Sequence, residues 1–137
     1  MSLVLGSSMT LAWIYVDEMN PAVQQVSNTV NESGAWVPSI WPLEIANSLQ
    51  LSVRRGRVDK DFRDESLADL ARLNIRVDPD TDRYAWADTL DLAEHFDLTC
   101  YDACYLELAQ RLQMPLASLD RKLRLAAERL GLSLLGA

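Results

Sequence analysis

Three carboxylates stand in otherwise apolar stretches of the chain, and they are the residues best suited to do chemistry. Glu44 lies in IWPLEIANSL, Asp102 in LTCYDACYLELA, and Asp120 at the end of MPLASLD. Because removing a charge from water is costly unless a partner compensates, an acid in an apolar run indicates a partner or a role. Three such acids with few nitrogen or sulfur donors favour a shared Mg²⁺ or Mn²⁺ ion over zinc.

The chain supplies few residues for a zinc or disulfide site. Cys100 and Cys104 are its two cysteines, and His95 is its one histidine. The cysteines lie four positions apart in a predicted helix, where a disulfide is sterically unfavourable, so we interpret both as small buried hydrophobic residues. We interpret His95 as a cation near a helix end rather than as a catalytic base.

Short apolar runs alternate with helical patterns along the whole chain, which predicts βαβ units. We expect strands at 3–5, 35–37, 74–77, 115–119 and 132–135. We expect helices at 8–16, 20–31, 40–54, 59–73, 80–96, 99–113 and 120–130, with Asn20, Asp59, Asp80 and Thr99 as N-caps. The prediction is one α/β domain spanning 1–137, with a central parallel sheet of about five short strands and helices on both faces.

This arrangement predicts that the three acids converge on one pocket. Ligands of open α/β sheets bind outside the carboxyl ends of the strands, and the strand at 115–119 delivers Asp120 to that edge. Thr99 caps the helix whose first turn carries Asp102. Glu44 and Asn47 share one helix face. Asn47 therefore either supports Glu44 through a hydrogen bond or hydrogen-bonds a backbone group. Taken singly, Asp102 and Asp120 would be ordinary helix caps or solvated turn acids.

The charge of the chain limits which partners it can have. Its net charge is −7, which excludes a protein that coats nucleic acid by long-range attraction but not a nuclease with a local acidic metal site. Arg121, Lys122 and Arg124 follow Asp120 and are candidates to contact phosphates. Arg54 belongs to a second basic cluster that complements its own helix end or contacts RNA.

Two further patterns bear on location and packing. The sequence has no apolar run near the ~18 residues of a membrane span and no signal-peptide pattern, so we expect a cytoplasmic protein without membrane contact. We interpret Trp13, Trp36, Trp41 and Trp86 as packing residues rather than base-stacking platforms.

Four stretches, covering nearly the whole chain, resemble PIN-domain ribonucleases of the VapC toxin kind. They are LVLGSSMTLAWIYVDE, WPLEIANSL, LTCYDACYLELAQRLQMPLASLD and RKLRLAAERLGLSLL. The run YDA-x-YLELA, followed closely by PLASLD, is the most specific part. The resemblance implies a Mg²⁺- or Mn²⁺-dependent endoribonuclease that hydrolyses RNA phosphodiesters as the toxin of a toxin–antitoxin pair. It also implies a small antitoxin protein as partner and a homodimer.

The resemblance also assigns site residues. The family's middle acid falls on Glu44, its YDA acid on Asp102 and its post-strand acid on Asp120, while Ser118 matches a hydroxyl that often precedes the last acid. The family's first acid, at the end of the first strand, falls on Gly6.

Gly6 cannot bind a cation, and Ser7 and Ser8 beside it offer only weaker oxygen ligands or a water contact. Two functions therefore follow from the resemblance. The chain is an active metal-dependent ribonuclease, or it is a catalytically impaired PIN module that binds antitoxin or dimerises without efficient cleavage. An aspartate at position 6 is expected to increase cleavage. An unrelated phosphotransfer or receiver-like domain is a third reading, but the chain lacks the early acidic cluster and late lysine of such domains.

Overall fold

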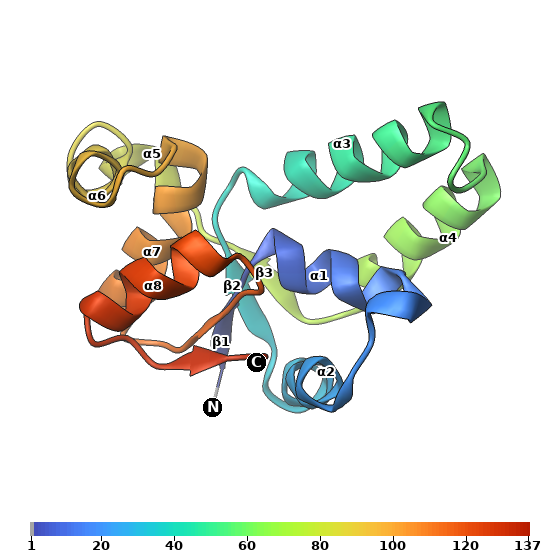
Figure 1. Cartoon of the computed structure of the whole chain (residues 1–137), viewed down its shortest axis with the longest axis horizontal. Coiled ribbons are helices and arrows are strands. Elements are labelled where there is room, and N and C mark those ends of the chain that lie inside the picture. The colour runs from blue at the N-terminus through green and yellow to red at the C-terminus, as the bar shows by residue number, and fades with distance from the viewer. Residues whose placement is uncertain (1) are drawn as a thin grey trace.

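The computed structural model describes residues 2–137, in which short parallel strands lie between two groups of helices (Figure 1). The strands are β1 (Leu3–Leu5), β2 (Ala35–Val37), β3 (Ile75–Val77), β4 (Leu116–Ala117) and β5 (Leu134–Leu135). The helices are α1 (Ser7–Ile14), a 3₁₀ turn (Val16–Glu18), α2 (Pro21–Ser33), α3 (Trp41–Arg54), α4 (Lys60–Ala71), α5 (Thr81–Tyr84), α6 (Asp88–Phe96), α7 (Cys100–Leu112) and α8 (Arg121–Arg129).

The strands form one parallel sheet in the order β3-β2-β1-β4-β5. Val4 of the central strand pairs with Trp36 of β2 on one side and with Leu116 of β4 on the other. The chain thus runs outward from β1 to β3 and then crosses back to β4. The strand order reverses between β1 and β4, and such a switch point is where open α/β sheets bind ligands.

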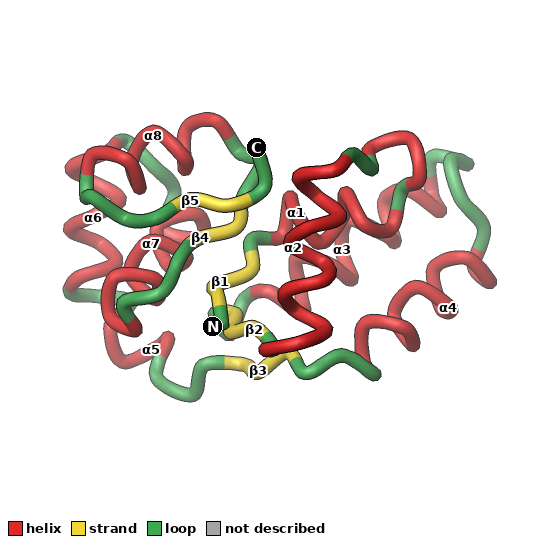
Figure 2. Tube along the Cα trace, turned by 90° about the horizontal axis from the view of Figure 1, so that it is seen from below, coloured by secondary structure: helices red, strands yellow, loops and turns green. Residues whose placement is uncertain are grey.

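The helices cover both faces of this sheet. Figures 1 and 2 show α1 to α4 on one side of the strands and α5 to α8 on the other. This division follows from right-handed crossovers, because the reversal of direction after β3 moves the later helices to the opposite face. The predicted parallel sheet with helices on both faces is confirmed.

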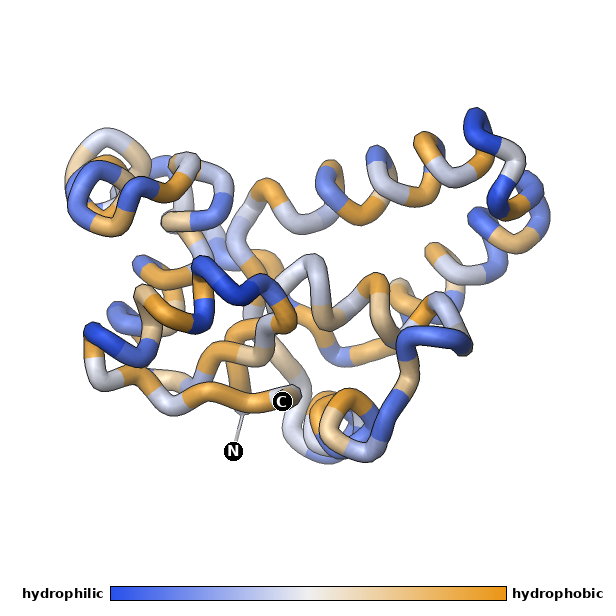
Figure 3. Tube along the Cα trace, viewed as in Figure 1, coloured by the Kyte–Doolittle hydropathy of each residue, from blue (hydrophilic) through white to orange (hydrophobic). Residues whose placement is uncertain are grey.

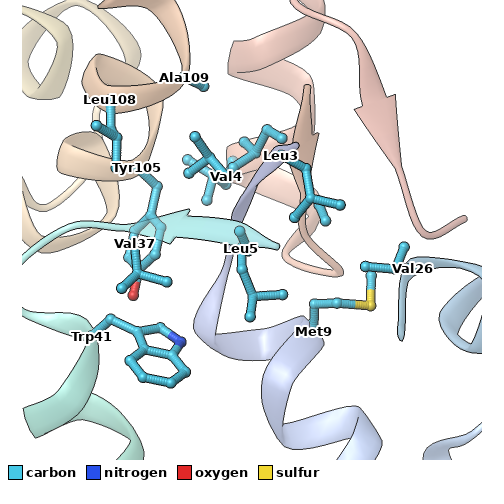
Figure 4. Close-up of a cluster of buried hydrophobic side chains, with 14 of the residues drawn as sticks. Leu3, Val4, Leu5, Met9, Val26, Val37, Trp41, Tyr105, Leu108 and Ala109 are labelled. Atoms are coloured by element: carbon cyan, nitrogen blue, oxygen red, sulfur yellow. The ribbon is translucent and has the colours of Figure 1, made fainter. Parts of the chain in front are cut away.

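The core lies around the central strand. Leu3, Val4 and Leu5 are fully buried, as expected for a parallel strand covered on both faces. Figure 4 shows Tyr105 and Trp41 near Leu5 on one side of this strand. Hydrophobic residues dominate the strands, whereas hydrophobic and hydrophilic residues alternate along α3 (Figure 3), which is the pattern of a helix with one buried face.

Three of the predicted N-caps are confirmed. The side chain of Asn20 accepts a hydrogen bond from the Val23 amide, that of Asp59 from the Phe62 amide, and that of Thr99 from the Asp102 amide. Each bond satisfies a backbone donor that the first turn of its helix leaves free.

The single helix predicted at 80–96 was wrong, and so was its cap. Asp80 makes no side-chain capping bond; instead its amide donates to the carboxylate of Asp78. The helix breaks into α5 and α6 because the two halves have different partners: α5 is held by Asp78, while α6 packs along α7.

The last two strands are shorter than predicted. Pairing in β4 stops at Ala117 because the next residue, Ser118, directs its hydroxyl to the Asp120 amide. β5 is limited to Leu134–Leu135, the residues that pair with β4. Across residues 2–137, no helix combines the length and the apolar character that crossing a bilayer would need.

Candidate functional site

The carboxyl ends of β1 and β4 are joined by a set of short hydrogen bonds. The Gly6 amide donates to the Ala117 carbonyl at 2.8 Å. Just beyond, the hydroxyls of Ser8 and Ser118 lie 3.3 Å apart, and the Leu119 amide donates to the Ser8 hydroxyl at 2.9 Å. These contacts fix the switch point of the sheet. Ser8, which the sequence offered only as a weak oxygen ligand, instead helps to position the segment after β4.

Asp120 is held at this edge by both its backbone and its side chain. Its amide donates to the Ser118 hydroxyl at 3.1 Å, and its Oδ1 accepts from the Leu123 amide at 2.9 Å, which caps α8. One carboxylate oxygen therefore has a structural role. The other makes no hydrogen bond to any residue that the structure describes, and the side chain is exposed at the switch point.

Gly6 is a point of very close approach between two backbones. A Cβ built on it would lie 2.8 Å from the Ala117 carbonyl oxygen, closer than side chains tolerate against backbone. Its φ of −73° is ordinary, so space and not conformation requires glycine here. An aspartate at position 6 would therefore have to push β1 and β4 apart.

Asp102 occupies the first turn of α7 and interacts with Asp120 across the switch point. Burial and the negative charge of Asp120 raise the pKa of Asp102, although a hydrogen bond with Thr99 and the charge of Lys122 oppose the shift. Burial is the larger cause, and the Asp120 charge adds to it because no nearby cation fully offsets the two carboxylates.

Glu44 joins this pair from α3. Burial raises the pKa of Glu44, and the charge of Asp102 adds to that rise, while a hydrogen bond from Tyr105 partly offsets it. The Tyr105 phenol donates to Glu44 Oε1 at 2.5 Å, and the side chain of Ser7 also hydrogen-bonds that phenol. Burial and the Glu44 carboxylate raise the pKa of Tyr105, so the phenol stays a donor.

Sequence reasoning missed Tyr105. The signal was available, since Tyr105 lies three positions after Asp102 and so shares its helix face. Its ring was read only as part of the YDA-x-YLELA motif, and an apolar helix face does not reveal which polar group an aromatic hydroxyl will meet.

The acids form an arc rather than a compact cluster. Glu44 feels the charge of Asp102, and Asp102 feels that of Asp120. Within the described part of the chain, no three His, Cys, Asp or Glu side chains are grouped closely enough to hold a metal together. Glu44 turns toward Tyr105 and Asp120 toward the head of α8, which spreads the set.

This donor set nevertheless suits one class of cation. Mg²⁺ is commonly held by one or two carboxylates and keeps several of its waters, whereas zinc needs a closed set of nitrogen or sulfur ligands. Asp102 and Asp120 offer two carboxylates within electrostatic reach of each other, and Glu44 can act through a water molecule. The electrostatic strain between the acids is what a divalent cation would relieve.

Asn47 does not hydrogen-bond Glu44, which was one of the two roles predicted for it. Its side chain makes no hydrogen bond to Glu44 or to any other residue in 2–137, and Glu44 Oε1 accepts from the Tyr105 phenol. Asn47 is exposed and lines an open groove beside Glu44 together with Ile40, Leu43 and Tyr101.

The predicted phosphate-binding cations divide into two groups. Arg121 and Lys122 open α8 beside Asp120, and both are exposed. Arg124 was a wrong choice, because it points inward and donates to the carbonyls of Ser118 and Leu135 at 2.7 and 2.9 Å. Arg54 lies at the far end of α3, about 15 Å along the helix axis from Glu44, and cannot reach the arc.

The cysteines and tryptophans follow their predictions only in part. Cys104 is buried, but Cys100 is exposed because it opens α7. Trp41 is buried and donates to the Thr10 hydroxyl, which in turn donates to the Gly6 carbonyl. Trp86 is 93% exposed in the link between α5 and α6, so it does not pack in the core, and packing at an interface stays a prediction for this residue.

A second charged cluster lies away from the switch point and was not predicted. Arg111 of α7 contacts Asp78 at 2.6 Å and Glu107 at 2.8 Å, and its guanidinium stacks on the Tyr84 ring. Burial opposes ionisation of Asp78, but hydrogen bonds from Arg111, Thr81 and the Asp80 amide hold its pKa below the usual value. Both acids thus have a cation inside the protein, which the acids of the arc lack.

Comparison with known proteins supports the fold. The chain matches no protein-family model and no curated protein sequence. Eight chains of solved structures match it. One is the crystal structure of PAE2754 from Pyrobaculum aerophilum, with a TM-score of 0.71 and 21% sequence identity over 98% of this chain and 83% of that chain. The two chains share a fold.

Proposed function

We propose that this chain is a Mg²⁺- or Mn²⁺-dependent endoribonuclease of the PIN-domain kind and the toxin of a toxin–antitoxin pair. The observation that carries the proposal is the pair of Asp102 and Asp120 at the β1–β4 switch point, where each carboxylate lacks a full cationic partner. The sequence resemblance through YDA-x-YLELA and PLASLD supplies the reaction.

Each residue of the site would have a distinct role in this reaction. Asp102 and Asp120 would hold the cation, and Ser118 and Ser8 keep the segment around Asp120 in place. Glu44, oriented by the Tyr105 phenol, would position water and accept its proton. When bound, the cation supplies charge neutralisation at the phosphate and activation of water. Arg121 and Lys122 would contact phosphate oxygens beside the bond that is cut.

The test is cleavage of single-stranded RNA with Mn²⁺, Mg²⁺ or EDTA. Asp102→Asn and Asp120→Asn should each reduce cleavage by at least about a hundredfold, because each removes a charged ligand while keeping an oxygen. Asp61→Asn is the matched control, since Asp61 is an exposed acid on α4, and it should cleave like wild type. Cleavage that persists in EDTA, or that survives both substitutions, would refute the assignment.

A second candidate is favoured by Gly6. The close approach of β1 and β4 leaves no room for the acid that the resemblance expects, and a site with one carboxylate fewer binds its cation more weakly. The chain would then be an impaired PIN module that binds antitoxin or dimerises without efficient cleavage. Absence of cleavage at any divalent concentration, together with tight antitoxin binding, would select this alternative.

The proposed protein partner follows from the same acids. A small antitoxin would place an arginine or lysine against the arc, because a guanidinium can bridge two carboxylates. Trp41 is buried in the core and offers no surface to such a segment. Trp13 lines a cavity of about 390 Å³ with Ile14, Phe62 and Leu70, and this surface would take the antitoxin's apolar residues.

A further inference from the structure

An open groove of about 400 Å³ lies directly beside the acid arc. It is lined by Ile40, Leu43, Glu44, Asn47 and Tyr101, from α3 and from the first turn of α7. Glu44 belongs both to this groove and to the arc, so the two are continuous. Whatever occupies the groove therefore lies next to the group that the arc acts on.

The walls of the groove are unusually apolar and aromatic for an exposed surface. The Leu43 side chain is 70% exposed and Tyr101 is 62% exposed, although large hydrophobic residues are normally covered. Tyr101 is the residue immediately before Asp102 and is held in the helix, where its carbonyl accepts the Cys104 thiol at 2.9 Å. The backbone of Tyr101 is thus fixed in the helix beside Asp102, and its exposed ring lines the groove.

The charge of the groove restricts its occupant. Among the described residues that line the groove, Glu44 is the one acid and none is a cation. A phosphate would be repelled here, whereas a flat uncharged ring would bury apolar surface against Leu43 and stack on Tyr101. Asn47 stands at the edge with a side-chain amide that has no partner within residues 2–137. An amide offers one acceptor and two donors, which match the hydrogen-bonding edge of a nucleobase.

We propose that this groove binds the base of the nucleotide next to the scissile phosphate, with Tyr101 stacking on the base and Asn47 reading its edge. This inference rests on the proposed ribonuclease function and adds its substrate preference. It requires an unpaired base, because a base inside a duplex has no free face for Tyr101. The substrate is therefore single-stranded or looped RNA with a preferred nucleotide at this position.

Steady-state cleavage of a pool of single-stranded RNA oligonucleotides in Mn²⁺, with the cut ends sequenced, tests this. Tyr101→Ala should raise KM about tenfold with little change in kcat, since stacking acts mainly on binding. Tyr101→Phe keeps the ring and should behave like wild type. Asn47→Ala should flatten the nucleotide preference at the cut. Leu125→Ala, which removes a 49% exposed hydrophobic residue outside the groove, should change nothing.

The outcomes separate the two proposals. If wild type cleaves but Tyr101→Ala keeps its KM and its pattern of cut ends, the base site is overturned and the ribonuclease stands. If wild type does not cleave with any divalent cation, the ribonuclease fails and the base site fails with it. If Tyr101→Ala cleaves normally but binds the antitoxin about tenfold more weakly, the groove receives a protein, which also overturns the base site.

Discussion

Asp102 is an acid whose surroundings disfavour its charged form in the folded protein. Its pKa is raised by burial and by Asp120, so the folded protein takes up a proton more readily than the unfolded chain. The repulsion is therefore present at neutral pH and is relieved as the pH falls through the raised pKa toward the usual value near 4. Acid in this range should stabilise the site.

Asp102→Asn should make the protein as stable as wild type or more stable at pH 7 in EDTA, by about 1 kcal/mol or less. The amide removes one of two facing charges but still accepts a hydrogen bond. Thermal melts between pH 4 and pH 7.5 measure the difference, which should vanish at the acid end. Added Mn²⁺ should raise the melting temperature of wild type more than that of the variant. A variant that melts well below wild type would instead identify Asp102 as a structural residue of α7.

At position 6, the resemblance expects an acid, but the close approach of β1 and β4 leaves little room for a side chain. Gly6→Ala should lower the free energy of unfolding by about 1–3 kcal/mol, since the new methyl group meets the Ala117 carbonyl. Gly6→Asp should be at least as destabilised in EDTA. It should regain more stability than Gly6→Ala when Mn²⁺ is added and should cleave RNA faster than wild type.

Chemical unfolding of the two variants, with and without Mn²⁺, separates the effect of space from that of charge. Wild-type stability in Gly6→Ala would show that β1 and β4 can move apart at little cost. An equal response of both variants to Mn²⁺ would argue against any metal-binding role for position 6.

At the scale of elements, Arg111 ties α7 to the segment after β3. Replacing it leaves Asp78 and Glu107, each about 3% exposed, without their cation. Arg111→Met should therefore lower the free energy of unfolding at pH 7 by about 3–5 kcal/mol. Because the pKa of Asp78 is lowered in the folded state, its ion pair contributes above its usual pKa and is lost as the pH falls through the lowered value. The difference from wild type should shrink in acid.

Urea unfolding at pH 7 and near pH 3 provides the measurement, with Arg72→Met as control. Arg72 pairs with Asp69 at 2.6 Å, but both side chains are about three-quarters exposed, so its loss should cost less than about 1 kcal/mol. Similar losses for the two variants would show that burial does not strengthen the Arg111 cluster.

The elements also show what sequence patterns can and cannot predict. Asn20, Asp59 and Thr99 were identified as caps because a cap depends on residues within one turn. Asp80 failed because Asp78, two positions earlier, already binds its amide and Arg111. The contact with Arg111 cannot be read locally, since Arg111 comes from a different helix.

In the acid site too, local sequence predicts some features, and others depend on contacts with distant residues. A strand end and a helix start placed Asp120 and Asp102 at one edge of the sheet, and the structure brings them within electrostatic reach. The direction of the Glu44 carboxylate depended on Tyr105, whose hydroxyl has no sequence signature of its partner. The apolar run Leu3–Leu5 predicted a strand, but no local pattern tells that it is central or on which side β4 pairs.

At the scale of the whole molecule, the net charge of −7 decides how partners approach. An antitoxin segment carrying arginine or lysine should bind with an affinity that falls as salt rises from ~50 to ~200 mM. Salt screens the attraction between the basic segment and the exposed acids of this protein. Apolar contacts near Trp13 should add a negative heat-capacity change. Asp120→Asn should weaken binding.

Calorimetric titration with the product of the neighbouring gene, at two salt concentrations and two temperatures, tests this model. Tight binding that is indifferent to both salt and Asp120→Asn would place the interface away from the acid arc. The molar mass of the free protein in solution would show whether it forms the homodimer that the resemblance implies.

The two serines that join β1 to β4 are 110 positions apart in the chain. During synthesis Ser8 is therefore added roughly 5–20 s before Ser118, at elongation rates of about 5–20 residues per second. In that interval the nascent chain carries Glu44 and then Asp102, but Asp120 does not yet exist and nothing holds the end of β1 against a neighbour on that side. The ribonuclease that we propose would therefore lack one of its metal-binding acids, and so would not cut, while residues 1–119 are being added on the ribosome.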